Sequence, residues 1–282
     1  MTKTWHLRNE VWQLPAIGGI MGILNVTPDS FSDGGRHNSP EQALQHAAAL
    51  VQAGADIIDI GGESTRPGSL PVAIEEELRR TIPVIRALRE QFPTLKISID
   101  TRHVSVAAAA LDAGADIIND ISGLSDSAMR RLCAERPCGI VLMHMQGTPE
   151  TMQQAPHYDN VVEDVRQFFI RQLNVAQADG ISPERICLDP GIGFGKTTTH
   201  NLALIKHLRE LTIHNGPMMM ALSRKRFMGE ILRNPAAARS SALPTVTLSL
   251  MAADAGADLH RVHDVEELHQ ALTLRHALLH TS

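Results

Sequence analysis

Three apolar runs in the middle of this 282-residue chain each lead to a side chain that accepts hydrogen bonds. Asp100 ends "LKISID", Asn119 follows "AGADII" and Asp189 ends "RICLD". An ionised aspartate accepts two parallel N–H bonds, so acceptors of this kind suit a flat heterocycle that is rich in donors. A protein-bound transition metal is the alternative use of such residues, but no HxH or HxxE pattern accompanies these three positions.

Cationic side chains are grouped in the last third of the chain, away from these acceptors. Residues 223–225 read "SRK", and residues 261–263 read "RVH". The chain carries a net charge of -5, so two cationic groups that converge would favour an anionic, phosphorylated substrate. Solvated surface charge is the alternative explanation for each group taken alone.

An internal echo indicates the elements that must position these residues. "AGADIIDIGG", "AGADIINDIS" and "AGADLHRVHD" each follow an Ala-rich helical stretch and lead into a short apolar run. A glycine just past a helix end supplies a left-handed cap, so each echo predicts a helix, a turn and a buried strand. Further apolar runs at 19–25, 95–101, 139–144, 185–191 and 217–223 bring the number of expected strands to eight.

Strict alternation of eight strands with helices predicts an α/β fold, a single (β/α)8 TIM barrel that forms one domain over residues 1–282. An open doubly wound sheet is the alternative, but it would use few strand ends for its ligand. Here nearly every expected strand ends in a polar residue: Asn25, Asp59, Asp100, Asn119, His144, Asp189, Ser223 and Arg261. We expect these residues at the C-terminal mouth of the barrel, and a β-hairpin from "TWHLRNEVWQLP" at its other end.

Three loops after the expected strands carry further candidate residues. "NVTPDSFSDGG" (25–35) has the composition of a mobile lid with ligand contacts, and "GGESTRPG" (61–68) would lie at the same face; ordinary solvated loops are the alternative. "DPGIGFGK" (189–196) lacks the GxxxxGK[ST] spacing of a nucleotide P-loop. Its glycines are expected to let the backbone turn tightly under a planar ligand, with Phe194 against it.

Composition limits the expected partners and compartment. The acidic balance gives no broad basic surface, so neither nucleic acid nor an anionic membrane is an expected partner. The N-terminus lacks the apolar core of a secretory signal, and no apolar run approaches the roughly 18 residues of a membrane span. Three cysteines with no CxxC pair fit reduced thiols, so we expect a cytoplasmic protein.

The chain resembles the dihydropteroate synthase family, a family of pterin-binding TIM barrels, from about residue 20 to residue 265. The motifs that carry the resemblance are "MGILNVTPDSFSDGG", "GGESTRPG", "SIDT", "NDI", "LMHMQGTPETMQ", "LDPGIGFGK", "SRK" and "RVHDV". The resemblance implies a transferase of folate biosynthesis that condenses p-aminobenzoate with 6-hydroxymethyl-7,8-dihydropterin diphosphate and releases diphosphate. It further implies Mg2+ as cofactor, competition by sulfonamides and a homodimer.

The resemblance also implies a role for individual residues. The pterin would be held by Asp100, Asn119, Asp189 and Lys225, with Met143 and Phe194 beside its ring. The diphosphate would be held by Asn25, Arg261 and His263, with Mg2+ near Asn25, and Ser223 would be a further substrate-binding residue. The p-aminobenzoate pocket would be shaped by Phe31, Thr65, Arg66 and Pro67. Asp100, Asp189, Lys225 and Arg261 would carry the catalysis, because Mg2+ and cations stabilise the departing diphosphate while the acceptors favour positive charge on the pterin methylene.

Two positions depart from the family pattern. Ala221 stands where the family usually has a glycine beside the pterin, and "SSALPTVTLS" replaces a Gly-Ser or Gly-Thr pair with Pro244 and Thr245. Proline suits the first turn of a helix, so we expect the fold to tolerate Pro244. Two alternatives to an active synthase therefore stay open: a corrinoid-linked methyltransferase that shares the pterin half, and a non-catalytic pterin-binding paralogue.

Overall fold

Eight parallel strands form a barrel in this computed structural model, which describes residues 3–27, 40–63 and 72–281. The strands are β3 (Gly19–Asn25), β4 (Ile57–Gly61), β5 (Lys96–Asp100), β6 (Ile117–Asp120), β7 (Gly139–Met143), β8 (Ile186–Asp189), β9 (Met219–Met220) and β10 (Leu259–Val262). Their order is β8-β7-β6-β5-β4-β3-β10-β9, and a parallel bridge between Leu188 and Met218 closes the circle. The predicted (β/α)8 barrel is confirmed, and all eight strands lie within the expected runs.

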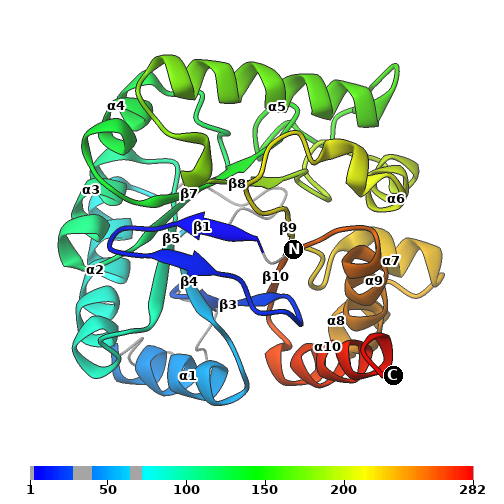
Figure 1. Ribbon diagram of the computed structural model, residues 1–282, viewed down its shortest axis with the longest axis horizontal. Helices are drawn as coiled ribbons and strands as arrows, with labels where there is room; N and C mark the ends of the chain where they lie inside the picture. Colours follow the sequence, from blue (N-terminus) through cyan, green and yellow to red (C-terminus); the bar gives the residue numbers. More distant parts are fainter. Residues whose placement is uncertain (1–2, 28–39, 64–71, 282) are drawn as a thin grey trace.

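Helices alternate with the strands and surround the barrel (Figure 1). They are α1 (Pro40–Gln52), α2 (Ile74–Gln91), α3 (Val104–Ala113), α4 (Ser127–Glu135), α5 (Val161–Ala178), α6 (Thr198–Lys206), α7 (Arg226–Ile231), α8 (Ala237–Ser240), α9 (Leu243–Asp254) and α10 (Val265–Leu279), with short 3-10 turns at Pro183–Arg185 and Leu208–Leu211. None of the helices in the described part of the chain combines the length and apolar character that crossing a bilayer requires.

The recurring "AGAD" sequence has a structural explanation at the N-terminal ends of the strands. The glycines 54, 114 and 256 have φ values of 106°, 115° and 106°, so each adopts the left-handed conformation after its helix. The aspartate two residues later accepts the backbone N–H of a neighbouring strand: Asp56 from Ile20 at 2.8 Å, Asp116 from Ile97 at 3.0 Å and Asp258 from Met218 at 2.9 Å. The repeated "AGAD" sequence therefore encodes one type of junction, in which the glycine ends a helix and the aspartate bonds the chain to the sheet.

The predicted hairpin is present and covers the N-terminal end of the barrel. Strands β1 (Thr4–His6) and β2 (Val11–Gln13) are antiparallel and cross this end in front of the barrel strands in Figure 1. Trp5 and Trp12 pack in one buried cluster with the lowest inward-facing residues of the barrel, and the Trp5 indole donates to the Arg185 carbonyl at 2.8 Å. The barrel interior is thus filled at its N-terminal end, so the C-terminal mouth is the open end.

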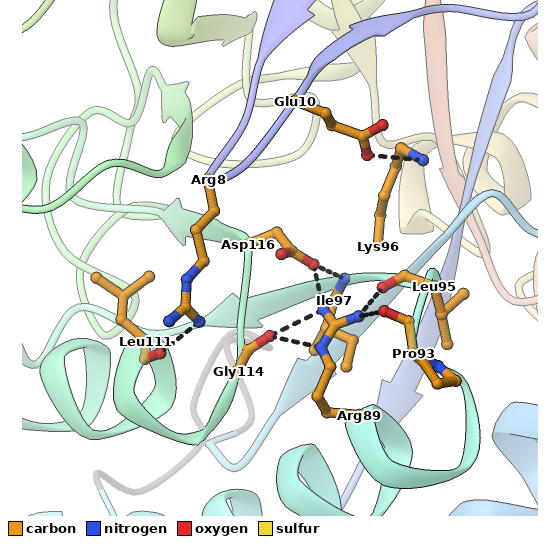
Figure 2. Close-up of polar contacts among 10 residues, drawn as sticks. All are labelled: Arg8, Glu10, Arg89, Pro93, Leu95, Lys96, Ile97, Leu111, Gly114 and Asp116. Carbon is orange, nitrogen blue, oxygen red and sulfur yellow. Dashed lines mark hydrogen bonds and ion pairs between the residues drawn. The ribbon is translucent and has the colours of Figure 1, made fainter.

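Polar contacts attach the hairpin tip to the same end of the barrel (Figure 2). Arg8 donates to the Leu111 carbonyl at 2.8 Å, and Glu10 pairs with Lys96 at 3.1 Å. Beside them, Arg89 on α2 pairs with Asp116, the aspartate of the second "AGAD" junction. These charges lie at the end opposite the mouth, and the contacts of Arg8 and Glu10 hold the hairpin there.

The two-residue period of a strand determines which residues enter the site. Ile57, Ile117, Cys187 and Leu259 point into the barrel, because they pack with the hairpin in one buried cluster. Successive side chains on a strand alternate between its faces, so the residue two positions later also points inward. Those residues are Asp59, Asn119, Asp189 and Arg261. The polar layer of the mouth therefore stands directly on the apolar layer that the hairpin seals.

Candidate functional site

Arg261 lies at the centre of the polar layer and bridges two carboxylates. Its Nε donates to Asp59 Oδ2 at 2.6 Å, and its Nη2 donates to Asp100 Oδ2 at 2.7 Å. Asn119 Nδ2 donates to the same Asp59 oxygen at 3.1 Å. Since a carboxylate cannot donate, this contact directs the amide nitrogen of Asn119 toward Asp59 and its oxygen away from it. Side chains from β4, β5, β6 and β10 thus form one connected network.

Burial and the two carboxylates act in opposite directions on the pKa of Arg261. Burial disfavours the charged guanidinium, but Asp59 and Asp100 more than compensate and raise its pKa above the ordinary value. Burial raises the pKa of Asp100; the nearby guanidinium opposes this effect and Asp59 adds to it. Arg261 consequently stays protonated, whereas Asp100 is easier to protonate than an exposed aspartate.

Asp59 belongs to this network, although its position in the sequence predicted only a place at the mouth and no ligand or role. It is completely buried, and its Oδ1 has no hydrogen-bond partner among the described residues. Its Oδ2 holds both Arg261 and Asn119. The available signal was its register: Asp59 stands two residues after Ile57, as Asn119 stands two residues after Ile117.

Asp189 and Lys225 form the second polar part of the site. Asp189 Oδ1 accepts the Gly191 N–H at 2.7 Å, and Lys225 Nζ lies 4.2 Å from the centre of the Phe194 ring. Burial lowers the pKa of Lys225 to about 8, although Asp189 favours its charged form. Burial raises the pKa of Asp189, and the Gly191 N–H and Lys225 oppose this rise. A cation and a carboxylate therefore stand beside an aromatic face.

An apolar wall completes this part of the mouth. Met143 and Phe194 belong to one buried cluster together with Ile121 and Met152. The wall lies next to Asp189, since Met143 is the register partner of Asp189 in the β7–β8 ladder. Ala221, the residue that departs from the family pattern, is 7% exposed and follows the inward-facing Met219 by two residues. Its methyl group therefore belongs to the same layer as the acceptors.

The loops after β9 and β10 are connected to each other. Ser223 Oγ and His263 Nδ1 are 2.9 Å apart, and the His263 N–H donates to Ser223 Oγ at 3.2 Å. Arg224 has a φ of 58°, and its N–H donates to Thr245 Oγ1 at 3.2 Å. Pro244 occupies the first turn of α9, as expected, so "LPT" preserves the helix while Thr245 supports the turn that precedes Lys225.

Asn25 is the predicted Mg2+ ligand, and its surroundings fit that chemistry in part. It ends β3, half-buried, and a β-carbon placed on Gly61 would lie 3.5 Å from Asn25 Oδ1 and 3.8 Å from Asp100 Oδ2. An amide oxygen is a suitable ligand for Mg2+, which commonly binds one or two protein groups together with substrate phosphates. Within the described ranges no three His, Cys, Asp or Glu side chains form a metal cluster, so phosphate oxygens would have to complete the shell.

The predicted p-aminobenzoate residues lie outside the described residues. Phe31 belongs to 28–39, and Thr65, Arg66 and Pro67 belong to 64–71. The described ends of the second segment are joined: the Val72 N–H donates to Glu63 Oε1 at 3.0 Å, and Arg102 pairs with Glu63 at 3.1 Å. The four residues stay a prediction, as does the lid.

Comparison with known proteins identifies the family of this chain. The profile of the family described as pterin-binding enzymes matches residues 21–263. The dihydropteroate synthase of Escherichia coli K12 is 46% identical over 260 residues, which cover 92% of this chain and 91% of the relative. The chain belongs to the dihydropteroate synthase family of pterin-binding enzymes. The predicted resemblance is confirmed, and the protein is a transferase.

Solved structures of the dihydropteroate synthase family have the same architecture. The Xanthomonas albilineans enzyme with 4-aminobenzoic acid has a TM-score of 0.91 and 42% identity, with full coverage of both chains. The Yersinia pestis enzyme in a sulfonamide complex has a TM-score of 0.90 and 41% identity, over 99% of this chain and all of the other. The first of these proteins binds 4-aminobenzoic acid and the second binds a sulfonamide drug.

Proposed function

We propose that this protein condenses p-aminobenzoate with 6-hydroxymethyl-7,8-dihydropterin diphosphate to give 7,8-dihydropteroate and diphosphate. The observation that carries the proposal is the inward-facing set of Asp100, Asn119 and Asp189 beside the Met143 and Phe194 wall. A pterin is flat, apolar on its faces and rich in N–H donors along one edge. The acceptors match its edge, and the Met143 and Phe194 wall matches its faces.

The chemistry consists of displacing a diphosphate leaving group. The bond between the pterin methylene and the diphosphate oxygen breaks, the aniline nitrogen bonds to that carbon, and the nitrogen then loses a proton. Asp100 and Asp189 stabilise positive charge that develops on the pterin, whereas Arg261 and Lys225 stabilise the negative charge that leaves. Ser223 and His263, which hold each other, are positioned to orient the anion. Bound through Asn25, Mg2+ would supply further charge neutralisation on the diphosphate.

Phe31, Thr65, Arg66 and Pro67 are proposed to form the p-aminobenzoate pocket, where sulfonamides compete. The motifs "NVTPDSFSDGG" and "GGESTRPG" support this assignment. The three cysteines are free and buried, which supports a reducing, cytoplasmic compartment.

A homodimer is proposed from the outer surface of α9 and α10, which pack against each other (Figure 1). Large apolar side chains are exposed on these helices: Leu243, Met251, Leu274, Leu278 and Leu279. A second copy of the chain would cover them. Light scattering is expected to give twice the chain mass, and the L274E/L278E double variant is expected to give the monomer mass. A monomeric wild type would disprove the dimer.

Diphosphate release is the assay that tests the proposed function. Release from the pterin diphosphate should require p-aminobenzoate and Mg2+, and a sulfonamide should raise KM for p-aminobenzoate. Release without p-aminobenzoate would indicate a different acceptor. Pterin binding without any release would instead support the non-catalytic paralogue.

The affinity for a pterin is expected to depend on the charge of Lys225. Its ammonium is present below a pH of about 8 and is lost above it, because burial lowers the pKa to about 8. A donor to the pterin thus disappears as pH rises, and Kd should increase from pH 7 to pH 9 by up to about tenfold for each unit above 8. Calorimetry at half-unit intervals measures this change.

The Lys225→Met variant is the control for this titration. It should bind the pterin more weakly at pH 7 and should lack the step near pH 8, which separates the lysine from titration of the pterin itself. A wild-type Kd that stays constant between pH 7 and pH 9 would remove Lys225 from the contacts.

A further inference from the structure

Lys196, the last residue of "DPGIGFGK", is a lysine in the protein interior. Its exposed fraction is 3%, and its side chain turns back beneath its own loop instead of pointing into the mouth. Nζ lies 3.0 Å from the Gly191 carbonyl, 3.0 Å from the Phe194 carbonyl and 2.9 Å from His144 Nδ1. The fold encloses this amine in acceptors, although the reaction proposed above uses it nowhere.

The partners of Lys196 match its charged form. Two carbonyl oxygens can only accept, so an ammonium donates to both of them and gives its third proton to His144 Nδ1. In that state the proton of His144 is on Nε2. Burial and the Lys196 cation lower the pKa of His144 to about 3, so the imidazole is neutral. Burial lowers the pKa of Lys196 to about 7, and Asp189 opposes this effect.

Further contacts hold the other carbonyls of the same loop. Gln153 Nε2 donates to the Gly193 carbonyl at 2.8 Å, and the Tyr158 hydroxyl donates to the Gly195 carbonyl at 2.8 Å. Together with Lys196, these side chains bind the carbonyls of four of the five residues from 191 to 195. Turning these oxygens toward the mouth would break the contacts. The Phe194 ring of the same loop lies under Lys225.

The close packing around Gly191 leaves no room for a different backbone conformation of the loop. A β-carbon on Gly191 would lie 1.9 Å from the His144 carbonyl oxygen, and Gly191 has a φ of 67°. The Gly191 N–H binds Asp189 Oδ1, so the position of residue 191 also determines the orientation of the pterin-facing carboxylate. A displacement of the Gly191 peptide would therefore affect both Asp189 and Phe194.

We propose that Lys196 is a positioning residue of the pterin site, which holds the 191–195 backbone so that Asp189 and Phe194 face the heterocycle. The inference rests on the proposed function, because it assumes that a pterin occupies this part of the mouth. Lys196 acts through these two residues and does not contact the substrate.

The Lys196→Met variant tests the proposal, since methionine retains an unbranched chain but donates no hydrogen bond. Calorimetry with 6-hydroxymethylpterin should give a Kd raised at least tenfold. Inorganic diphosphate with Mg2+, titrated separately, should bind within twofold of the wild type. Lys206→Met, an exposed lysine at the end of α6, is the matched control and should change neither affinity. A weaker pterin affinity with an unchanged diphosphate affinity indicates loop positioning. A general loss of structure would weaken the binding of both ligands.

The outcomes separate this inference from the proposed function. If the wild type binds no pterin, the proposed function fails. If the wild type binds it and Lys196→Met binds it equally well, the positioning role alone is wrong. Tyr158→Phe removes only the bond to the Gly195 carbonyl and buries no new charge, so it serves if Lys196→Met does not fold. It should raise the pterin Kd roughly threefold without affecting diphosphate, and an unchanged Kd would contradict the role assigned to the loop carbonyls.

Discussion

Replacing Arg261 by alanine is expected to lower kcat/KM for the pterin diphosphate by roughly 30- to 1000-fold, equivalent to about 2 to 4 kcal/mol of transition-state binding. The variant loses a cation that stabilises the departing diphosphate. It also leaves Asp59 and Asp100 facing each other without the guanidinium that binds both at 2.6 and 2.7 Å. The acceptors for the pterin are therefore disturbed together with the anion site.

The same change is expected to destabilise the fold, because removing one partner of a buried ion pair leaves an uncompensated charge. The cost is about 3 kcal/mol, and protonation of Asp100 reduces it at low pH. Thermal melting should therefore accompany the kinetics, and rates should be normalised to folded protein. Arg226→Ala removes an arginine whose side chain is 74% exposed and should leave kcat/KM within twofold. Wild-type kcat/KM in folded Arg261→Ala would refute the assignment.

The Asp189→Asn variant is expected to weaken pterin binding at least roughly tenfold. Asp189 Oδ1 accepts the Gly191 N–H at 2.7 Å, so the oxygen of the new amide must take that position. The amide nitrogen then faces the pterin, where it meets the N–H donors of the ring. One hydrogen bond is lost and one repulsion is gained, which makes this isosteric change severe.

Calorimetry with a pterin and no second substrate measures this effect directly. Inorganic diphosphate should bind nearly normally, because Asp189 does not belong to the anion side of the mouth. Asp112→Asn, at the end of α3 with an aspartate that is 66% exposed, is the isosteric control. Equal pterin affinity in Asp189→Asn and the wild type would mean that the heterocycle binds elsewhere.

Much of the barrel is encoded locally and was predictable from the sequence. Each "AGAD" contains a glycine that ends a helix and an aspartate that accepts a backbone N–H at the strand preceding that helix, so the junction is visible in four consecutive residues. The apolar runs of 139–143 and 186–188 are continuous because both faces of their strands are buried. The polar ends of the strands follow from the same pattern, since a parallel barrel places all of its C-terminal ends at one mouth.

The tertiary structure decided how these polar residues are paired. Arg261 and Asp59 are 202 residues apart, and only the closing of the barrel brings them within 2.6 Å. Its sequence position predicts that Arg261 binds an anion, and the structure adds that its guanidinium lies between two carboxylates. Lys196 likewise follows a glycine-rich loop as a phosphate-binding lysine would, yet the fold buries it beneath that loop. Local spacing fixes which face of a strand a side chain occupies, but the partner across the barrel depends on strand order, register and desolvation, which no short stretch of sequence contains.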